Sequence, residues 1–238
     1  MKAFLLAAGL GTRLRPLTDN IPKCLVPLEG KPLLYYWIRL FERYGIDELL
    51  INLHYRPEAV RKYVESLNTR LKINLFYEKE LMGSAGTVFA NREWIGNDAE
   101  FVIAYADNLT CLDIGSMFRA HKEHNGVMTI GLFKAAKPEE CGIVSMSSDG
   151  LITGFYEKIK NPPGDLANAG VYIADRIIFD IIGQEGKMDF GFDVLPKLTG
   201  RIYGYKINEY FIDIGTPENY SNACREWGKV LESYSFLR

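Results

Sequence analysis

The chain has 238 residues, of which 47% are hydrophobic and 24% charged, and its formal net charge at pH 7 is −2. This composition is typical of a soluble globular protein and excludes a disordered chain. The small net charge also argues against a protein that binds nucleic acid through its overall electrostatic field.

Cysteine usage and hydropathy indicate the compartment. The four cysteines are far apart in the sequence and form no CxxC pair, so they predict neither a zinc site nor a disulfide framework. No apolar stretch approaches the roughly 20 residues of a transmembrane helix, and the N-terminal apolar run is short for a signal peptide. We expect a cytoplasmic protein with no membrane or nucleic-acid partner, and a homo-oligomer is compatible with the sequence.

The first half of the chain alternates short apolar runs with amphipathic patterns, which predict buried strands and helices. Strands are predicted at residues 2–8, 49–53, 71–77 and 100–106, and helices at 32–45, 57–67 and 113–124. Such alternation indicates βαβ units with right-handed crossovers and a mostly parallel sheet.

The second half of the chain has a more antiparallel pattern. Residues 143–146 and 151–156 flank an Asp149-Gly150 turn and predict a hairpin. Further strands are predicted at 127–133, 171–174, 201–206 and 210–214, and a closing helix at 217–233. We therefore predict a single domain over residues 1–238, with a Rossmann-like three-layer α/β fold and a mixed, mostly parallel central sheet.

A glycine-rich segment, Gly9-Leu10-Gly11-Thr12-Arg13, follows the first predicted strand. Glycines let the backbone approach an anion closely, so that its N–H groups can bind phosphate oxygens. The dinucleotide fingerprint GxGxxG fails at Leu14, which excludes a typical dinucleotide-binding oxidoreductase, and the Walker lysine is absent. Arg13 and Lys23 add two cations beside this segment, either for phosphate oxygens or as solvated surface charges.

The glycine-rich segment is part of a longer motif, LLAAGLGTRLRPLTDNIPKCLVPLEGKPLLYY, at residues 5–36. This motif resembles the opening signature of the nucleotide-sugar pyrophosphorylases, the nucleotidyltransferases that act on sugar 1-phosphates. The similarity continues through GSAGT at 83–87, ADN at 106–108, YEK at 156–158, NAG at 168–170 and DIGTPE at 213–218. Among these enzymes the chain is most similar to short mannose- and heptose-1-phosphate guanylyltransferases.

The resemblance implies which residues bind the nucleotide. These residues are Leu6, Ala8, Gly9, Gly11, Thr12, Arg13, Glu78, Gly83 and Ser84. A carboxylate at Glu78 could accept hydrogen bonds from two N–H donors of guanine, whereas uracil offers one. This chemistry favours GTP, although Glu78 is also compatible with a charged strand end.

The reaction implied by the resemblance joins a nucleoside triphosphate to a sugar 1-phosphate and releases pyrophosphate. A phosphate monoester already carries about −1.5 to −2 charges at neutral pH, so its oxygen is a nucleophile without a general base. Catalysis then requires positioning and charge neutralisation. We expect Arg13, Lys23 and Asp107 to be catalytic, and Asp107 and Asp213, which follow predicted strands, to hold Mg²⁺.

The resemblance also implies a sugar-phosphate site, for which the candidates are Glu157, Lys158, Asn168, Gly170 and Asp193. Lys158 would bind the phosphate, and Glu157 would accept hydrogen bonds from sugar hydroxyls. We expect a nucleotide-binding half at residues 1 to about 110 and a sugar-phosphate half from about 111 to 238.

Two alternatives to a guanylyltransferase remain at this level. One is a uridylyl- or thymidylyltransferase that uses glucose-, N-acetylmuramate- or a related sugar 1-phosphate, because Asn108 follows the metal aspartate as in thymidylyltransferase-like members. The other is a non-catalytic nucleotide-sugar sensor subunit. A sensor is expected to have lost the charged centre, and this chain retains it.

Overall fold

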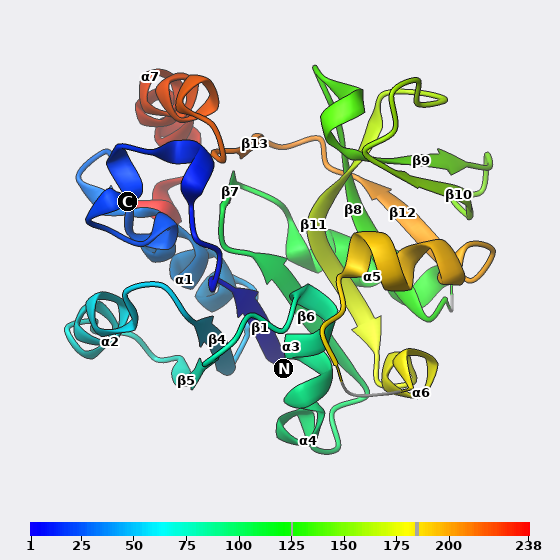
Figure 1. The fold of residues 1–238 in the computed structure, drawn as a ribbon, viewed down its shortest axis with the longest axis horizontal. Helices are drawn as coiled ribbons and strands as arrows, with labels where there is room; N and C mark the ends of the chain where they lie inside the picture. Colours follow the sequence, from blue (N-terminus) through cyan, green and yellow to red (C-terminus); the bar gives the residue numbers. More distant parts are fainter. Residues whose placement is uncertain (125, 184–185) are drawn as a thin grey trace. The chain divides into compact units, whose positions relative to one another are not determined.

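The computed structural model describes residues 1–124, 126–183 and 186–238. It confirms the predicted α/β fold with a mixed central sheet, mostly parallel in its core (Figure 1). The chain divides into two compact units. The first consists of Met1–Leu81, Ala104–Leu112 and Glu209–Arg238, and the second of Met82–Ile103 and Asp113–Asn208.

Parallel strands form the sheet of the first unit. They are β1 (Lys2–Leu6), β4 (Glu48–Leu53) and β5 (Lys72–Tyr77), in the order β1-β4-β5, with the C-terminal end of β6 (Glu100–Tyr105) next to β1. The continuous apolar run of β1 is explained by its burial, since Ala3, Phe4 and Leu5 have no exposed surface. The parallel arrangement brings the ends of these strands to one edge, where the glycine-rich segment begins.

Two short antiparallel pairs complete the strands of this unit. Strand β2 (Pro27–Leu28) pairs with β3 (Lys31–Pro32), and β7 (Asn108–Thr110) pairs with β13 (Phe211–Asp213). The second pair joins the segment that follows β6 to a segment about 100 residues further along the chain.

Three helices belong to the first unit: α1 (Leu33–Arg43), α2 (Pro57–Glu65) and α7 (Pro217–Ser233). Helix α1 has the predicted amphipathic pattern, and its apolar side chains Leu33, Trp37 and Phe41 are buried. It ends at Arg43, two residues before Gly45, whose φ of 71° is typical of a glycine that follows a helix C-terminus. Pro32 is its N-cap rather than its first residue.

The second unit is largely antiparallel, as the sequence predicts. Its strands are β8 (Met128–Lys134), β9 (Gly142–Met146), β10 (Ile152–Glu157), β11 (Leu166–Asp175) and β12 (Ile202–Lys206). Pairs β9–β10, β8–β11 and β9–β11 are antiparallel, whereas β12 adds to β8 in parallel. The N-terminal part of β6 belongs to this unit.

The α-helices among the described residues of the second unit are α3 (Ser84–Ala90), α4 (Arg92–Ile95), α5 (Ile114–His124) and α6 (Ile178–Ile182). Asp113 caps the N-terminus of α5, because its Oδ1 accepts a hydrogen bond of 2.8 Å from the Ser116 N–H. The sequence analysis did not predict α3, α4 or α6. These helices are short, and small residues such as Ala85 and Gly86 give α3 no apolar stripe that periodicity could detect.

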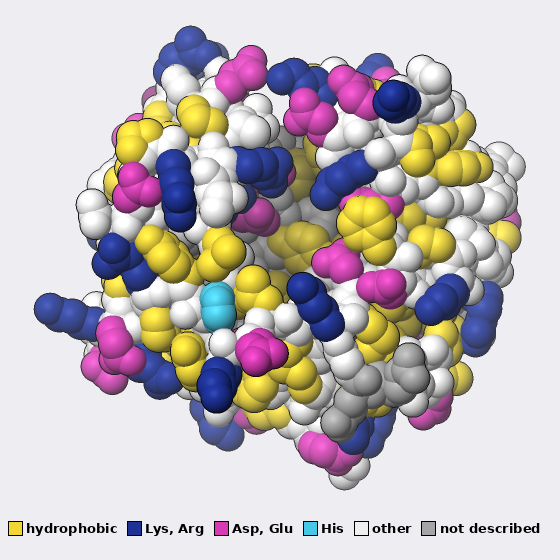
Figure 2. All heavy atoms as spheres, viewed as in Figure 1, with side chains coloured by type: hydrophobic (Ala, Val, Ile, Leu, Met, Phe, Trp, Pro, Cys, Tyr) yellow, Lys and Arg dark blue, Asp and Glu magenta, His cyan; other side chains and the backbone are white. Residues whose placement is uncertain are grey.

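Acidic and basic side chains are interspersed on the face of the molecule shown in Figure 2, in keeping with the small net charge. Within the described residues, no helix combines the length and the apolar character needed to cross a membrane.

Candidate active site

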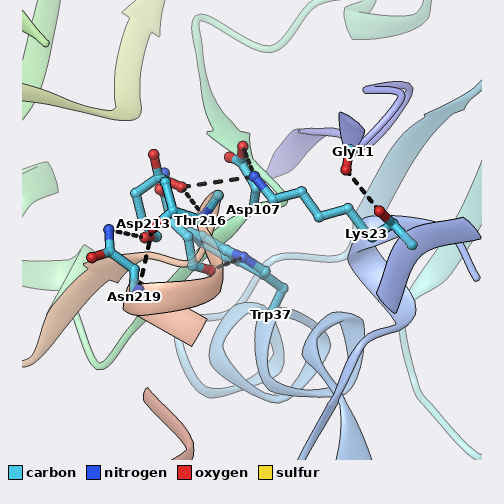
Figure 3. Close-up of polar contacts among 10 residues, drawn as sticks. Gly11, Lys23, Trp37, Asp107, Asp213, Thr216 and Asn219 are labelled. Atoms are coloured by element: carbon cyan, nitrogen blue, oxygen red, sulfur yellow. Dashed lines mark hydrogen bonds and ion pairs between the residues drawn. The ribbon is translucent and has the colours of Figure 1, made fainter. Parts of the chain in front are cut away.

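The charged centre of the first unit is formed by Lys23, Asp107 and Asp213 (Figure 3). Asp107 follows β6, and Asp213 is the last residue of β13. The β7–β13 register pairs Asp213 with Asn108, the residue after Asp107, and the Ile214 N–H donates to the Asp107 carbonyl at 3.0 Å. This register brings together two aspartates that are far apart in the sequence.

Lys23 binds both carboxylates. Its Nζ lies 2.7 Å from Oδ2 of Asp107 and 3.7 Å from Oδ1 of Asp213. A short 3-10 helix, Lys23–Leu25, positions the lysine, and its side chain is only 10% exposed. A largely buried ammonium needs such partners, because an unpaired charge in this position would be costly.

The two aspartates have opposite pKa shifts. Burial disfavours ionisation of Asp107, but Lys23 and Arg13 outweigh this effect and hold the pKa of Asp107 below its ordinary value. Burial and the nearby charge of Asp107 raise the pKa of Asp213 above its ordinary value, against the influence of Lys23 and Arg13. The lowered pKa keeps Asp107 ionised, so its negative charge balances the positive charges of the neighbouring Lys23 and Arg13.

Gly215 shows how closely these charges approach one another. A methyl group on its Cα would stand 2.8 Å from Oδ1 of Asp213, 2.9 Å from Nη2 of Arg13 and 3.0 Å from Nζ of Lys23. The structure therefore brings Arg13, Lys23, Asp107 and Asp213 together, and a side chain at position 215 would displace the charged ends of three of them.

The loop around Gly215 is fixed by α7. Thr216 caps this helix by accepting a hydrogen bond of 3.2 Å from the Asn219 N–H. The Asn219 side chain donates to the Asp213 carbonyl at 2.8 Å, and Oδ1 of Asp213 accepts from the Gly215 N–H at 2.7 Å (Figure 3). Helix α1 supports the other aspartate, because the Trp37 indole N–H donates to the Asn108 carbonyl at 2.8 Å.

The glycine-rich segment begins where β1 ends. Leu6 is the last residue of β1, Ala8 is buried, and Gly9 has open space where a side chain would be. Gly11 adopts a φ of 65°, and its carbonyl accepts a 2.7 Å hydrogen bond from the Thr18 hydroxyl. Thr12 starts a short 3-10 helix, Thr12–Leu14, that includes Arg13.

Glu78, the predicted base-contacting residue, is only 2% exposed and follows β5 directly. Its Oε1 accepts a 2.7 Å hydrogen bond from the side chain of Asn52 on β4. One oxygen of this carboxylate therefore has a partner within the protein, a contact that bears on its role below.

Gly83 and Ser84 lie in the second unit, at the start of α3. The Met188 carbonyl accepts hydrogen bonds from the N–H groups of Ala85 and Gly86, at 3.0 and 3.1 Å. The Ser84 hydroxyl donates to Oδ2 of Asp189 at 3.0 Å and accepts from the Phe190 N–H at 2.8 Å. These contacts fix the GSAGT segment against residues 188–190.

Glu157 and Lys158 follow one another at the end of β10 in the second unit. A methyl group on Gly142 or Gly191 would stand 2.4 or 2.6 Å from Oε2 of Glu157, so two glycines leave room for this carboxylate. Lys158 Nζ lies 3.4 Å from Oε1 of Glu157. Burial raises the pKa of Glu157, and the charge of Asp189 raises it further, while Lys158 acts in the opposite direction.

The remaining sugar-side candidates also have partners within the second unit. Asn168 Oδ1 accepts from the Gly170 N–H at 2.9 Å, and its amide donates to the Tyr172 hydroxyl at 2.8 Å. Asp193 Oδ2 accepts from the Asp189 N–H at 2.7 Å.

Sequence reasoning missed three residues that organise these groups: Asn52, Asp189 and Gly215. Asp189 and Asp193 are four residues apart, a spacing that could have suggested a capped turn. Gly215 lies inside the DIGTPE motif and was therefore detectable. No group of three or more potential metal ligands occurs among the described residues, so the two aspartates of the first unit stand as a pair.

Comparison with known proteins identifies the family. A model described as nucleotidyl transferase matches residues 2–229, and the chain belongs to this family. This match confirms the family resemblance that the sequence analysis drew from residues 5–36.

The chain is similar in sequence or in structure to several known proteins. It is 32% identical over 229 residues to the D-glycero-alpha-D-manno-heptose 1-phosphate guanylyltransferase of Aneurinibacillus thermoaerophilus, covering 95% of this chain and 98% of that protein. It is 31% identical to mannose-1-phosphate guanylyltransferase 1 of Arabidopsis thaliana, of which it spans 64%. The crystal structure of HddC from Yersinia pseudotuberculosis complexed with GMP-PN has a TM-score of 0.81, with 27% identity over 95% of this chain and 99% of that one.

Proposed function

We propose that this protein transfers a nucleotidyl group from a nucleoside triphosphate to a sugar 1-phosphate and releases pyrophosphate. The observation that carries the proposal is the convergence of Arg13, Lys23, Asp107 and Asp213 around Gly215. The named guanylyltransferase relatives favour GTP, with mannose- or heptose-1-phosphate as the acceptor. We infer that the reaction takes place in the cytoplasm.

The residues of the first unit supply positive charge for the triphosphate. Arg13 would bind the oxygens of the departing pyrophosphate with its planar guanidinium, and Lys23 would bind the phosphate under attack. The glycine-rich segment would offer backbone N–H groups to the same anion. The acceptor needs no general base, since its phosphate oxygen is already ionised.

Two carboxylates fit a divalent cation in the first unit. Asp107 and Asp213 already share one cation, the ammonium of Lys23, which shows that their oxygens converge on a positive charge. A pair of carboxylates with open positions matches Mg²⁺, which commonly combines one or two carboxylates with waters and substrate phosphates. When bound, the metal would neutralise charge on the phosphates.

The sugar phosphate would bind to residues of the second unit. Lys158 would pair with the phosphate, and Glu157, whose side chain is 13% exposed, would accept hydrogen bonds from ring hydroxyls. Asn168 and Asp193 would contribute further polar contacts, and Gly170, which has no side chain and a φ of 65°, would let the backbone approach a sugar ring.

Pyrophosphate release tests the proposal. The protein is incubated with Mg²⁺, each of five nucleoside triphosphates and a panel of sugar 1-phosphates, and released pyrophosphate is measured. We expect the highest kcat/KM with GTP and mannose- or heptose-1-phosphate. A preference for UTP or dTTP would replace the guanylyl assignment, and no release from any pair would leave the sensor alternative.

The same assay with the Asp107→Asn variant tests the role of Asp107. We expect it to lower kcat by about a hundredfold to a thousandfold, because it removes a charge that holds the phosphate-neutralising cation. Far-UV circular dichroism should remain unchanged. Activity near that of the wild type would show that the metal is held elsewhere.

A further inference from the structure

The peptide unit between Leu6 and Ala7 is held at both ends. Its carbonyl accepts a 3.0 Å hydrogen bond from the N–H of Ala106, the residue before Asp107. Its N–H, on Ala7, donates to Oδ1 of Asn52 at 2.6 Å. This peptide lies at the end of β1, and only Ala7 and Ala8 separate Leu6 from the glycine-rich segment, so its orientation influences how that segment leaves the sheet.

Asn52 takes the place of a backbone partner at the end of the sheet. It is paired with Leu6 in the parallel register of β1 and β4, which ends at this position. Because the Ala7 N–H can only donate, the oxygen of the Asn52 amide must face Ala7, which leaves the NH₂ group to face Glu78. The Asn52 amide accordingly donates to Glu78 Oε1 at 2.7 Å.

Burial makes this arrangement difficult to replace. Asn52 and Glu78 are 4% and 2% exposed. Asparagine is disfavoured in strands, and a buried polar group that loses its partner costs about 1–3 kcal/mol. The main chain of Glu78 is also fixed, because its N–H donates to the Leu53 carbonyl at 2.8 Å and its carbonyl lies 2.9 Å from Nδ1 of His54.

We infer that Asn52 and Glu78 are positioning residues for the proposed reaction. Through the Leu6–Ala7 peptide they fix the start of the glycine-rich segment relative to Asp107, and thus the triphosphate site relative to the metal site. A continuous series of hydrogen bonds runs from Ala106, next to Asp107, through this peptide and Asn52 to Glu78. The inference rests on the proposed function for its kinetic effect, whereas the hydrogen bonds themselves do not.

This positioning role differs from direct hydrogen bonding between the Glu78 carboxylate and the nucleobase. If Glu78 acts through Asn52, its charge is not required, and a glutamine oxygen can accept the same hydrogen bond. If Glu78 reads guanine, loss of the carboxylate changes the preference among nucleoside triphosphates. The two roles therefore predict different results for one substitution.

The inference can be tested by exchanging the hydrogen-bond donor and acceptor between residues 52 and 78. Asn52→Asp removes the NH₂ donor and places two carboxylates face to face. Adding Glu78→Gln restores a donor on the opposite side, so that the glutamine amide donates to the aspartate while the other aspartate oxygen still accepts from Ala7. Asn74→Asp makes the same change on β5, at a residue whose Nδ2 has no hydrogen-bond partner among the described residues, and serves as the matched control.

Steady-state kinetics of the full chain give the first readout. We expect Asn52→Asp to lower kcat/KM for the triphosphate on the order of a hundredfold, as a misplacement of about 1 Å can do, without changing KM for the sugar 1-phosphate. Asn74→Asp should stay close to the wild type, whereas Glu78→Gln should keep the wild-type preference among nucleoside triphosphates, because its amide oxygen can accept the same hydrogen bond. The double variant should recover to within about tenfold of the wild type, because residues in one hydrogen-bond network are not additive.

Three outcomes would overturn the inference: wild-type kinetics for Asn52→Asp, no recovery in a folded double variant, or a Glu78→Gln enzyme with altered preference between GTP and UTP. If Asn52→Asp does not fold, the double variant still decides, since it is expected to be both folded and active.

Amide hydrogen exchange separates this inference from the proposed function. Glu78→Met removes the acceptor and keeps a side chain of similar length, so the Ala7 amide should exchange at least about tenfold faster than in the wild type. This result requires no turnover. Unchanged exchange at Ala7 would refute the positioning role, whereas faster exchange in a protein that releases no pyrophosphate would refute only the proposed reaction.

Discussion

A single glycine limits how the charged centre is built. Gly215 is surrounded by Arg13, Lys23 and Asp213, and the atoms nearest to it are the ends of flexible side chains or a carboxylate oxygen. Such atoms can move away from an added methyl group, so the main consequence of a side chain here is displacement of the charges rather than loss of the fold.

Gly215→Ala is therefore predicted to impair catalysis more than stability. We expect kcat/KM to fall on the order of a hundredfold, while the melting temperature changes little. Steady-state kinetics and thermal unfolding measure the two effects. Gly164→Ala is the control, because no atom of the described residues, apart from Gly164 and its two chain neighbours, lies within 4 Å of the position that its methyl group would occupy. Equal activity in both variants would contradict this account of Gly215.

Glu157 illustrates a conflict between stability and binding. The pKa of this carboxylate is raised in the folded protein by burial and by Asp189. The native state therefore holds the proton more tightly than the unfolded chain does, and ionisation costs native stability. This loss begins as the pH rises past the ordinary pKa of glutamate and is complete above the raised pKa.

Glu157→Gln should remove this loss. At neutral pH we expect the variant to melt at a higher temperature than the wild type, by about 2–4 °C per kcal/mol gained, and the difference should shrink as the pH falls below the ordinary glutamate pKa. Thermal unfolding from pH 4 to pH 8 checks the sign. The KM for the sugar 1-phosphate should rise in the same variant. A difference in melting temperature that does not depend on pH would contradict the assigned pKa shift.

For individual residues, the sequence indicated a role where the residue lies within a long motif. Arg13 and Lys23 were predicted because they lie within a 32-residue signature. Asn52 was not predicted, because it is one polar residue within an apolar strand and its partner is a backbone N–H. The burial of Glu78 was likewise invisible, since its carboxylate is satisfied by a side chain 26 residues away in sequence.

At the level of elements, strand register determines which residues meet. The pairing of β7 with β13 places Asp213 beside Asn108 and so brings two distant aspartates to one cation. Both strands have only three residues, which is too short for an alternating pattern to be recognised. Strand ends were predicted from the sequence, but the pairing that joins them depends on long-range contacts that local patterns do not encode.

The start of α3 is another constrained element. Gly83 has a φ of 75°, and a methyl group on it would stand 2.2 Å from the Met188 carbonyl oxygen. The contact is with backbone, which cannot rotate away. The same carbonyl accepts the first N–H groups of the helix, so a shift of residue 188 would also uncap α3.

Gly83→Ala should consequently destabilise the protein by at least about 2 kcal/mol, from backbone strain and the displaced contact. Urea unfolding measures this change, again with Gly164→Ala as the control in the same unit. A loss below about 0.5 kcal/mol would indicate that residues 186–190 rearrange without cost.

At the scale of the whole molecule, the two units carry different predicted sites. The cations and aspartates for the nucleotide lie in the first unit, whereas Glu157, Lys158, Asn168 and Gly170 lie in the second. Gly83 and Ser84 also belong to the second unit. The predicted division into a nucleotide half and a sugar-phosphate half stays a prediction, and ligand binding can test it.

Amide hydrogen exchange with one ligand at a time provides this test. GTP should slow exchange at residues 5–13, and mannose 1-phosphate at 156–158 and 168–170, because each ligand stabilises the segments that it binds. Lys158→Ala should abolish the second effect and preserve the first. Protection of both regions by either ligand alone would argue against separate binding sites.

The division of the first unit into three chain segments has a consequence for synthesis. The second unit ends at Asn208, so all of its residues have been made before the ribosome reaches Glu209. The first unit is complete only after Glu209–Arg238 has emerged and β13 has paired with β7. The nascent chain carries Lys23 and Asp107 without Asp213 while residues 108–212 are made. Nascent chains and products of early termination that stop before Asp213 therefore lack the assembled centre.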